Sequence, residues 1–141
     1  MANFVTTNSA LAQHFATQMA SLEPSVKIQW ENAQPLSQAP DPRTAEWCRY
    51  SFRPGLDQIG ALGGITWRGT GVLMIQVFTP LGRGQGPNLD ILRNVQTLFR
   101  TGSPISGVRI ESYSIAQQGA TDDGWYQGTA SIRFEIDELL S

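Results

Sequence analysis

The segment from Ile65 to Pro80, ITWRGTGVLMIQVFTP, constrains the fold more than any other part of the chain. It begins as a polar ribbon broken by glycines and becomes almost wholly apolar from Val72 to Phe78. A strand with one face in water alternates apolar and polar residues. Here both alternating sets are apolar: Leu73, Ile75 and Val77 on one face, and Val72, Met74 and Phe78 on the other. We predict that helices of the same chain cover one face, and that a second copy or a partner covers the other.

Two segments have the periodicity of amphipathic helices. In the first, good N-cap types run from Thr6 to Ser9, Pro24 marks the end, and apolar residues recur at Leu11, Phe15, Met19 and Leu22. The second runs from Leu89 to Arg100, with Asn88 as its predicted cap. Its predicted buried stripe consists of Leu92, Val95 and Phe99.

Five segments have the composition and alternation of strands. They span residues 26–30, 46–53, 65–79, 108–116 and 125–136, with a hairpin loop predicted over 117–124. The predicted fold is α+β: a mainly antiparallel sheet of five strands, two helices packed on one face, and the order α-β-β-β-α-β-β. Residues 1–141 form one predicted domain, with extended loops over 32–45 and 54–64.

Composition excludes several classes of protein. No apolar run reaches the length of about eighteen residues that a membrane span requires, and the N-terminus lacks the basic region of a secretory signal. Cys48 is the only cysteine, so no internal disulfide is possible, and we predict a buried thiol.

Charge is distributed unevenly along the chain. Between Arg43 and Arg109 there are eight arginines and three acidic residues, a balance of +5, whereas the remainder carries −7. A basic middle and acidic ends would let neighbouring subunits meet head to tail; the alternative is an ordinary solvated surface on which charges are segregated by chance.

The residues of acid–base and metal chemistry are sparse. The only histidine, His14, has no set of metal ligands around it, and we predict that it lies on a helix face. The glycine-rich strings at 63–71 and 82–87 lack the ending of a phosphate-binding loop and are typical of turns. The acid pairs Asp122-Asp123 and Asp137-Glu138 are candidates for a divalent cation or are simply solvated. We predict no catalytic residue, no metal site and no cofactor.

Arginines lie among aromatic residues near Trp47 and again at Trp67, which is the composition of a single-strand nucleic-acid site. The acidic overall balance and the single lysine, Lys27, argue against a dedicated binder. If several copies of the chain formed a ring, a few arginines would be enough for a lumen that lets DNA pass without specific binding.

Three stretches of the sequence resemble the tail-terminator-like proteins of long-tailed phages. They are KIQWENAQP from Lys27, WRGTGVLMIQVFTPLGRG from Trp67 and WYQGTASIRFEID from Trp125. The most specific positions within them are Trp30, Glu31, Asn32, Arg68, Gly69, Gly71, Pro80, Trp125 and Tyr126.

The resemblance implies a structural virion protein. Such proteins form a ring, expected here to be a hexamer, which caps the tail tube, stops its polymerisation and presents the surface for head–tail joining. The implied partners are other copies of the chain, the tube protein and the head–tail connector. The implied location is the head-proximal end of the tail, after assembly in the host cytoplasm.

We predict that subunit or partner contacts involve residues of the long strand, of the 54–64 loop and several arginines: Val72, Met74, Phe78, Leu56, Ile59, Leu62, Arg53, Arg68 and Arg83. Other interpretations stay open at this point. They are a head–tail joining or tail-tube protein, a small ligand- or nucleotide-binding module that uses the 82–87 turn, and, least favoured, an enzyme.

Overall fold

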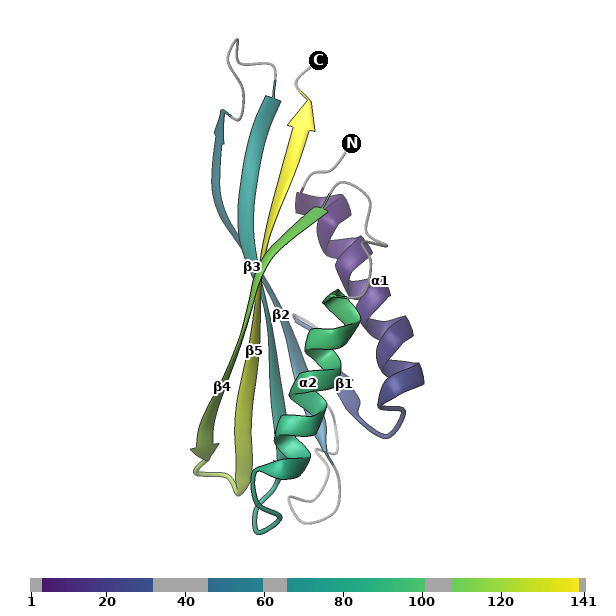
Figure 1. Ribbon diagram of the computed structural model, residues 1–141, viewed down its shortest axis with the longest axis vertical. Coiled ribbons are helices and arrows are strands. Elements are labelled where there is room, and N and C mark those ends of the chain that lie inside the picture. The colour runs from purple at the N-terminus through teal and green to yellow at the C-terminus, as the bar shows by residue number, and fades with distance from the viewer. Residues whose placement is uncertain (1–3, 32–45, 60–65, 101–107, 140–141) are drawn as a thin grey trace.

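A computed structural model describes residues 4–31, 46–59, 66–100 and 108–139 of the chain, and Figure 1 shows their arrangement. The elements are α1 (Phe4–Leu22), β1 (Lys27–Gln29), β2 (Trp47–Ile59), β3 (Thr66–Pro80), α2 (Gly86–Arg100), β4 (Val108–Ala120) and β5 (Trp125–Leu139). Both helices lie on the same side of a long, twisted sheet (Figure 1). The predicted α+β class, the order of elements and the one-sided helix layer are confirmed.

The sheet has five strands in the order β1-β2-β3-β5-β4. The β1–β2 pair is parallel and the other pairs are antiparallel. Strand β3 is central, and its pairing with β5 runs without interruption from Thr66 opposite Leu139 to Pro80 opposite Trp125. Strand β3, whose apolar pattern constrains the fold more than any other part of the sequence, therefore lies in the middle of the sheet.

Strand β2 is longer than predicted. It passes through Pro54 and Gly55 to Ile59, so the prediction that these two residues end it is wrong. Beyond the three-residue β1, β2 is the edge of the sheet, where a proline removes no ladder hydrogen bond. The pairing with β3 shifts register between Pro54 and Asp57. A Cβ on Gly55 would lie 2.8 Å from the carbonyl oxygen of Thr70, so glycine permits this close approach.

The last hairpin is also tighter than predicted. Strand β4 continues to Ala120 instead of ending at Ala116, and the loop shrinks to residues 121–124. Gly124 supplies the positive φ of 91° that this turn requires. The longer ladder follows from cross-strand pairs that extend as far as Ala120 opposite Tyr126.

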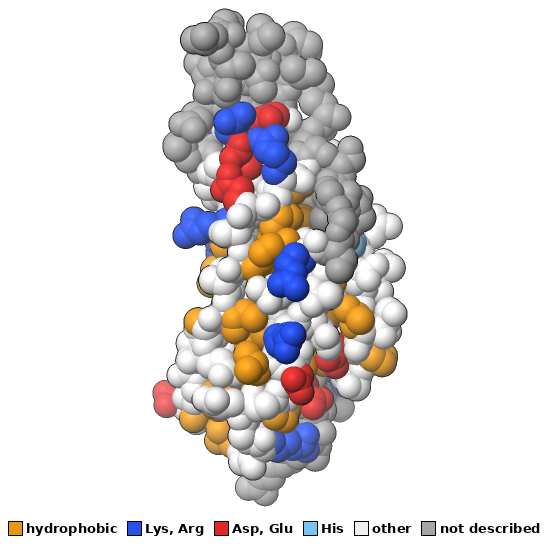
Figure 2. Space-filling view, in the orientation of Figure 1, with side chains coloured by type: hydrophobic (Ala, Val, Ile, Leu, Met, Phe, Trp, Pro, Cys, Tyr) orange, Lys and Arg blue, Asp and Glu red, His pale blue; other side chains and the backbone are white. Residues whose placement is uncertain are grey.

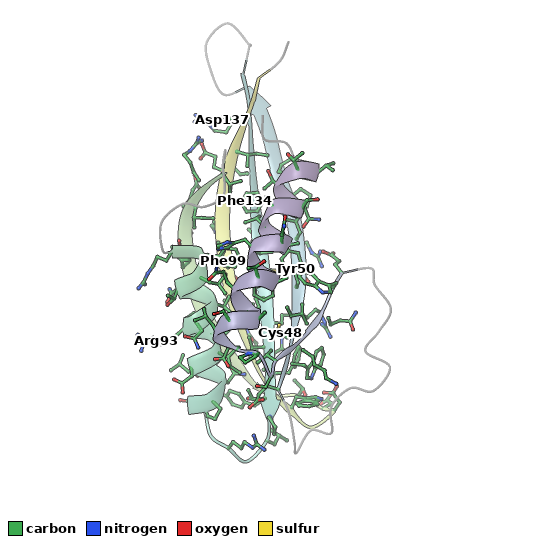
Figure 3. The ribbon with its side chains drawn as sticks, turned by 90° about the vertical axis from the view of Figure 1, so that its right-hand side faces the viewer. Cys48, Tyr50, Arg93, Phe99, Phe134 and Asp137 are labelled. Atoms are coloured by element: carbon green, nitrogen blue, oxygen red, sulfur yellow. The ribbon has the colours of Figure 1, made fainter. Side chains whose placement is uncertain are left out.

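The core lies between the helices and the sheet. Leu73, Ile75 and Val77 of β3 are fully buried there, as is Cys48 of β2, which confirms the predicted buried thiol. Phe15 of α1 stacks on Phe99 of α2, with ring centroids 6.2 Å apart. Figure 3 shows Cys48, Tyr50, Phe99 and Phe134 within this layer. Burial raises the pKa of Cys48 to about 12, so the thiol stays neutral at physiological pH.

Helix α1 begins at Phe4, so the predicted cap residues Thr6 to Ser9 lie inside the helix. The ring of Phe4 packs edge-on against Phe52 at a centroid distance of 6.4 Å and lies over Gly69. Burial of this aromatic ring against the sheet outweighs the local preference of the threonines for a cap. His14 lies on the helix as predicted, and its Nε2 is 2.7 Å from the carbonyl oxygen of Leu98, which links the two helices.

Helix α2 begins at Gly86, with Pro87 in its first turn, and Asn88 is therefore not its cap. The fully buried Asn88 instead donates its side-chain amide to the carbonyl oxygens of Val77 and Tyr126, at 3.0 and 3.1 Å. One side chain thus fastens the start of α2 to both β3 and β5. Within the described residues, neither helix has the length and apolarity needed to cross a membrane.

Replacing Gly128 by alanine should destabilise the protein by about 1–3 kcal/mol, because the added methyl group overpacks this junction. A Cβ there would overlap Asn88 Oδ1 and lie 2.6 Å from Leu92 Cδ1. Chemical denaturation of Gly128→Ala and of the control Gly86→Ala measures the effect. A Cβ on Gly86 would meet no atom within 4 Å, so the control should unfold close to the parent.

Candidate assembly surface

The side of the sheet that carries no helix is the candidate assembly surface, and we call it the helix-free face. Outward-pointing side chains of β2, β3, β5 and β4 form it, from an aromatic group near Trp125 to a charged group near Asp137. Because strand residues alternate between faces, Val72, Met74, Gln76 and Phe78 point here, opposite the buried set of β3.

Phe78 is covered by its own chain. Its ring stacks on Trp47 with centroids 4.2 Å apart, and Trp125 meets Trp47 edge-on at 6.0 Å. The guanidinium carbon of Arg49 lies 5.6 and 5.3 Å from the centroids of Trp47 and Phe78. Phe78 is consequently only 5% exposed. The sequence pattern predicts that Phe78 needs cover from a partner, but residues of its own chain cover it.

Val72 and Met74 are half-buried, and polar residues surround them. Met74 lies between Ser51 of β2 and Ser131 of β5, while Val72 lies between Arg53 and Arg133. The apolar surface that the helices leave open on β3 is therefore narrower than the sequence pattern indicates.

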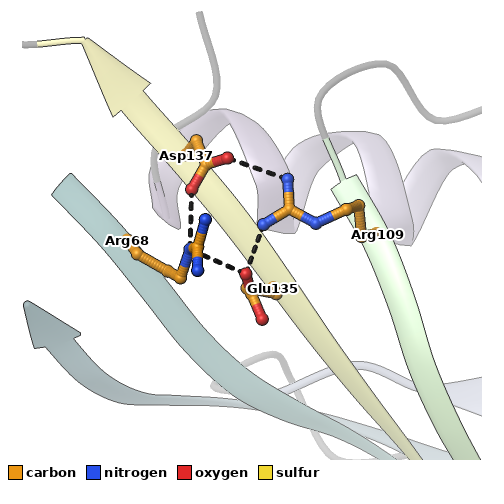
Figure 4. A network of polar contacts seen from close by, with 4 residues as sticks. All are labelled: Arg68, Arg109, Glu135 and Asp137. Atoms are coloured by element: carbon orange, nitrogen blue, oxygen red, sulfur yellow. Dashed lines mark hydrogen bonds and ion pairs between the residues drawn. The ribbon is translucent and has the colours of Figure 1, made fainter. Parts of the chain in front are cut away.

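A network of four charged side chains joins three strands at the far end of this face (Figure 4). Arg68 Nε of β3 lies 2.8 Å from a carboxylate oxygen of Glu135 and 3.1 Å from one of Asp137. Arg109 of β4 pairs with the same two acids, at 2.8 Å from Asp137. The hydrogen bond from Arg109 and a weaker one from Arg68 lower the pKa of Asp137 despite some burial.

Glu111 of β4 adds a third carboxyl group to this network. Its hydrogen bond with Glu135 raises the pKa of Glu111 and lowers that of Glu135, so Glu111 is the carboxyl group of this pair that binds a proton first as the pH falls.

Glu31 forms a second polar contact at the opposite edge of the sheet. One of its carboxylate oxygens accepts the backbone amide of Phe52 at 2.9 Å, and the other pairs with Arg53. Burial opposes ionisation of Glu31, but the hydrogen bonds from Phe52 and Arg53 outweigh it and lower the pKa. This contact gives a structural reason for glutamate at the motif position Glu31.

Part of the uneven charge distribution of the sequence is paired inside the protomer. Three arginines of the basic middle pair with acids from the two ends: Arg53 with Glu31, and Arg68 and Arg109 with Glu135 and Asp137. These pairs form by folding alone and need no contact between subunits.

Two members of the acid pairs already have partners in this arrangement. Asp137 is engaged by two arginines, and Asp123 accepts a hydrogen bond from Thr121 at 2.5 Å. Across the described residues, no group of three His, Cys, Asp or Glu side chains is placed to hold a metal ion. A hollow of about 350 Å³ lies beside Val72, with Arg53, Thr70, Glu111 and Arg133 on its walls.

The remaining predicted contact residues are spread over the molecule. Arg83 lies in the turn before α2, 3.8 Å from Glu46. Leu56 and Ile59 belong to the far end of β2, and Leu62 lies outside the described residues, as does the motif residue Asn32. Among the described side chains of the predicted set, Arg53, Val72 and Met74 lie together on the helix-free face, whereas Arg83 lies apart from them, in the turn before α2.

Several motif residues have packing roles. A Cβ on Gly69 would lie 2.8 Å from the Phe4 ring, and one on Gly71 would lie 2.9 Å from the Arg53 carbonyl oxygen. Trp30 packs on Tyr50 at 5.1 Å, and Trp125 is 3% exposed. Pro80 is buried, and the carbonyl oxygen of Tyr126 accepts the Asn88 amide. These positions preserve the sheet and its helix layer.

Sequence reasoning missed the roles of Trp47, Arg109 and Glu135. Alternation along the strand does not show that Trp47 covers Phe78, because the pairing of Trp47 with Phe78 depends on strand register. The Arg109–Glu135 pair depends in the same way on the opposition of β4 and β5.

Comparison with known proteins identifies the class. Residues 6–134 match a family model described as the phage tail terminator protein, so the chain belongs to this family of structural phage tail proteins. This confirms the resemblance seen in the sequence. A solved structure with 15% identity superimposes with a TM-score of 0.58, covering 95% of this chain and 98% of the other, which supports the fold. A search of curated proteins returned no match.

Removing the Asp137 carboxylate should cost stability at neutral pH by about 0.5–1 kcal/mol, because the arginine contacts are partly exposed. The lowered pKa of Asp137 means that its contribution is complete above the unfolded-state value of about 3.9 and is lost as the pH falls through the folded-state value. Melting of Asp137→Asn and the parent should therefore differ at pH 7 and converge in strong acid. The loop variant Asp122→Asn serves as the control, and an undiminished gap in acid would contradict the role of the ion pairs.

Proposed function

We propose that this tail protein forms a ring, of six copies, which caps the tail tube, ends tube polymerisation and presents the surface for head–tail joining. Membership of the tail terminator family carries the proposal. The protein would act at the head-proximal end of the tail, with the tube protein and the connector as partners and with DNA passing through the lumen.

The form of the protomer supports a ring. The helices cover one side of the sheet, whereas the helix-free face and the two edges of the sheet differ from one another in chemistry. Contacts between unlike surfaces of identical subunits are heterologous, and such contacts close into rings when their rotation closes. In this arrangement the half-buried Val72 and Met74 provide the apolar part of a contact.

The proposal is consistent with a structural role rather than a chemical one. The strongest polar constellation in the described residues, the Arg68–Arg109–Glu135–Asp137 network, pairs its charges with one another. Charges neutralised in this way stabilise a strand arrangement and leave little free for acid–base chemistry.

The mass of the assembly tests the ring directly. Size-exclusion chromatography with light scattering should show a species near six times the 15.5 kDa protomer, alone at high concentration or together with tube protein. Phage lacking the protein should carry abnormally long or headless tails in electron micrographs. Open, tube-like polymers of the purified protein would point to a tube subunit instead.

Aspartate at Val72 or Met74 should leave a folded protein that does not assemble, because a charge replaces apolar surface that the contact would desolvate. The control is Thr17→Asp on the exposed side of α1. Circular dichroism reports folding and light scattering reports assembly for all three variants. Normal assembly of the Val72→Asp and Met74→Asp variants would remove these residues from the interface.

A further inference from the structure

Among the described residues, β4 is the outermost strand on its side of the sheet, and its middle part is regular and uncharged. Between register shifts at Ile110/Ser112 and Gln117/Gly119, six consecutive residues pair in step with β5, from Ser112 opposite Arg133 to Gln117 opposite Gly128. No charged residue and no proline occurs from Ser112 to Ala120. Natural sheet edges are usually blunted by charges, prolines or short strands, because an open edge accepts further strands.

The opposite edge of the same sheet is blunted in several ways. Its outermost strand, β1, has only three residues and carries the exposed Lys27. Beyond β1, the Glu31 carboxylate occupies the outward amide of Phe52. Two residues further along the same edge, Pro54 has no amide hydrogen to offer. The contrast indicates that β4, and not β2, is the edge available for strand addition.

Side chains beside the β4 edge define what would fit there. Toward the helices, Tyr113 and Ile115 are half-buried, and the Tyr113 hydroxyl donates to the Phe99 carbonyl oxygen at the end of α2, at 2.8 Å. On the other face lie the small residues Ser112, Ser114 and Ala116, which leave room for the side chains of an added strand.

The neighbouring helix supplies two arginines, of which Arg93 also lines a hollow that contains Asp90 and Glu23. Arg93 and Arg100 are exposed and lie seven residues apart on α2, so both occupy the same side of the helix. Arg100 is close enough to Tyr113 to oppose part of the burial that raises the pKa of that phenol. Figure 2 shows basic side chains beside a strip of apolar ones along the middle of this side of the molecule.

We propose that an extended segment of another tail protein adds to the β4 edge as a sixth strand, with acidic side chains turned toward Arg93 and Arg100. Backbone hydrogen bonds to residues 112–117 supply the affinity, and the arginines select the sequence. The inference rests on the proposed function only for the identity of the donor as a tail protein.

Synthetic peptides provide the probes for this site. One alternates valine with glutamate, a second valine with lysine, and a third repeats the first with every backbone amide N-methylated. Fluorescence anisotropy should show the glutamate peptide binding about tenfold more tightly than the lysine peptide, and no binding of the methylated peptide. Hydrogen–deuterium exchange should slow at residues 112–117 and remain unchanged in β2.

Charge variants test whether Arg93 and Arg100 select an acidic peptide. The double variant Arg93→Gln/Arg100→Gln should weaken binding of the glutamate peptide about three- to tenfold. Lys27→Gln, at the opposite edge of the sheet, should leave it unchanged. Equal binding of the methylated peptide, or protection outside β4, would overturn strand addition at this edge.

Two further outcomes are decisive. Protection of residues 112–117 that grows with protein concentration alone, without peptide, would assign the edge to a second copy and overturn the proposal. Light scattering on the same samples reports the oligomeric state. If light scattering shows no ring although the glutamate peptide still binds, the result counts against the proposed function and not against this site.

Discussion

Two helices packed against a single face of the sheet impose the constraint from which the other features follow. Leu73, Ile75 and Val77 of β3 are fully buried beneath them. The side-chain amide of Asn88 holds the start of α2 to β3 and β5. The packing divides every strand into a set of residues committed to the core and a set left on the helix-free face. Within the described residues, the surfaces left for contacts in a tail are that second set, the two sheet edges and the outer surfaces of the helices.

The helix-free face owes its stability to contacts of its own rather than to a partner alone. At one end Trp47 covers Phe78 and Trp125, and at the other Arg68 and Arg109 hold Glu135 and Asp137. Aromatic stacking and charge pairing both operate across strands, so each fixes the register of its neighbours. The apolar remainder at Val72 and Met74 is small, so a contact built on this face would gain much of its specificity from polar complementarity.

The sequence predicts elements well where periodicity is strong and predicts boundaries poorly where tertiary contacts decide them. The double apolar pattern of 72–78 correctly predicts a strand, and the spacing of Leu11, Phe15 and Met19 correctly predicts a helix buried on one side. The start of α1 is missed because Phe4 finds cover on Phe52 and Gly69, which local propensity does not contain. The passage of β2 through Pro54 is missed because the tolerance of proline there depends on an edge position. The charge network is invisible for a similar reason, since it joins residues brought together only by strand order.

The two edges of the sheet make the protomer directional. The β1–β2 edge is shortened, occupied by Glu31 and interrupted by Pro54, whereas β4 presents a regular, uncharged run. A sheet with two open edges can grow in both directions without limit, as strand-templated polymers do. A sheet with one open edge can accept one added strand at that edge. Its other edge is blunted and offers no second site for strand addition. For a protein proposed to end a polymer, a strand added to β4 would attach through backbone hydrogen bonds without creating an equivalent site at the other edge.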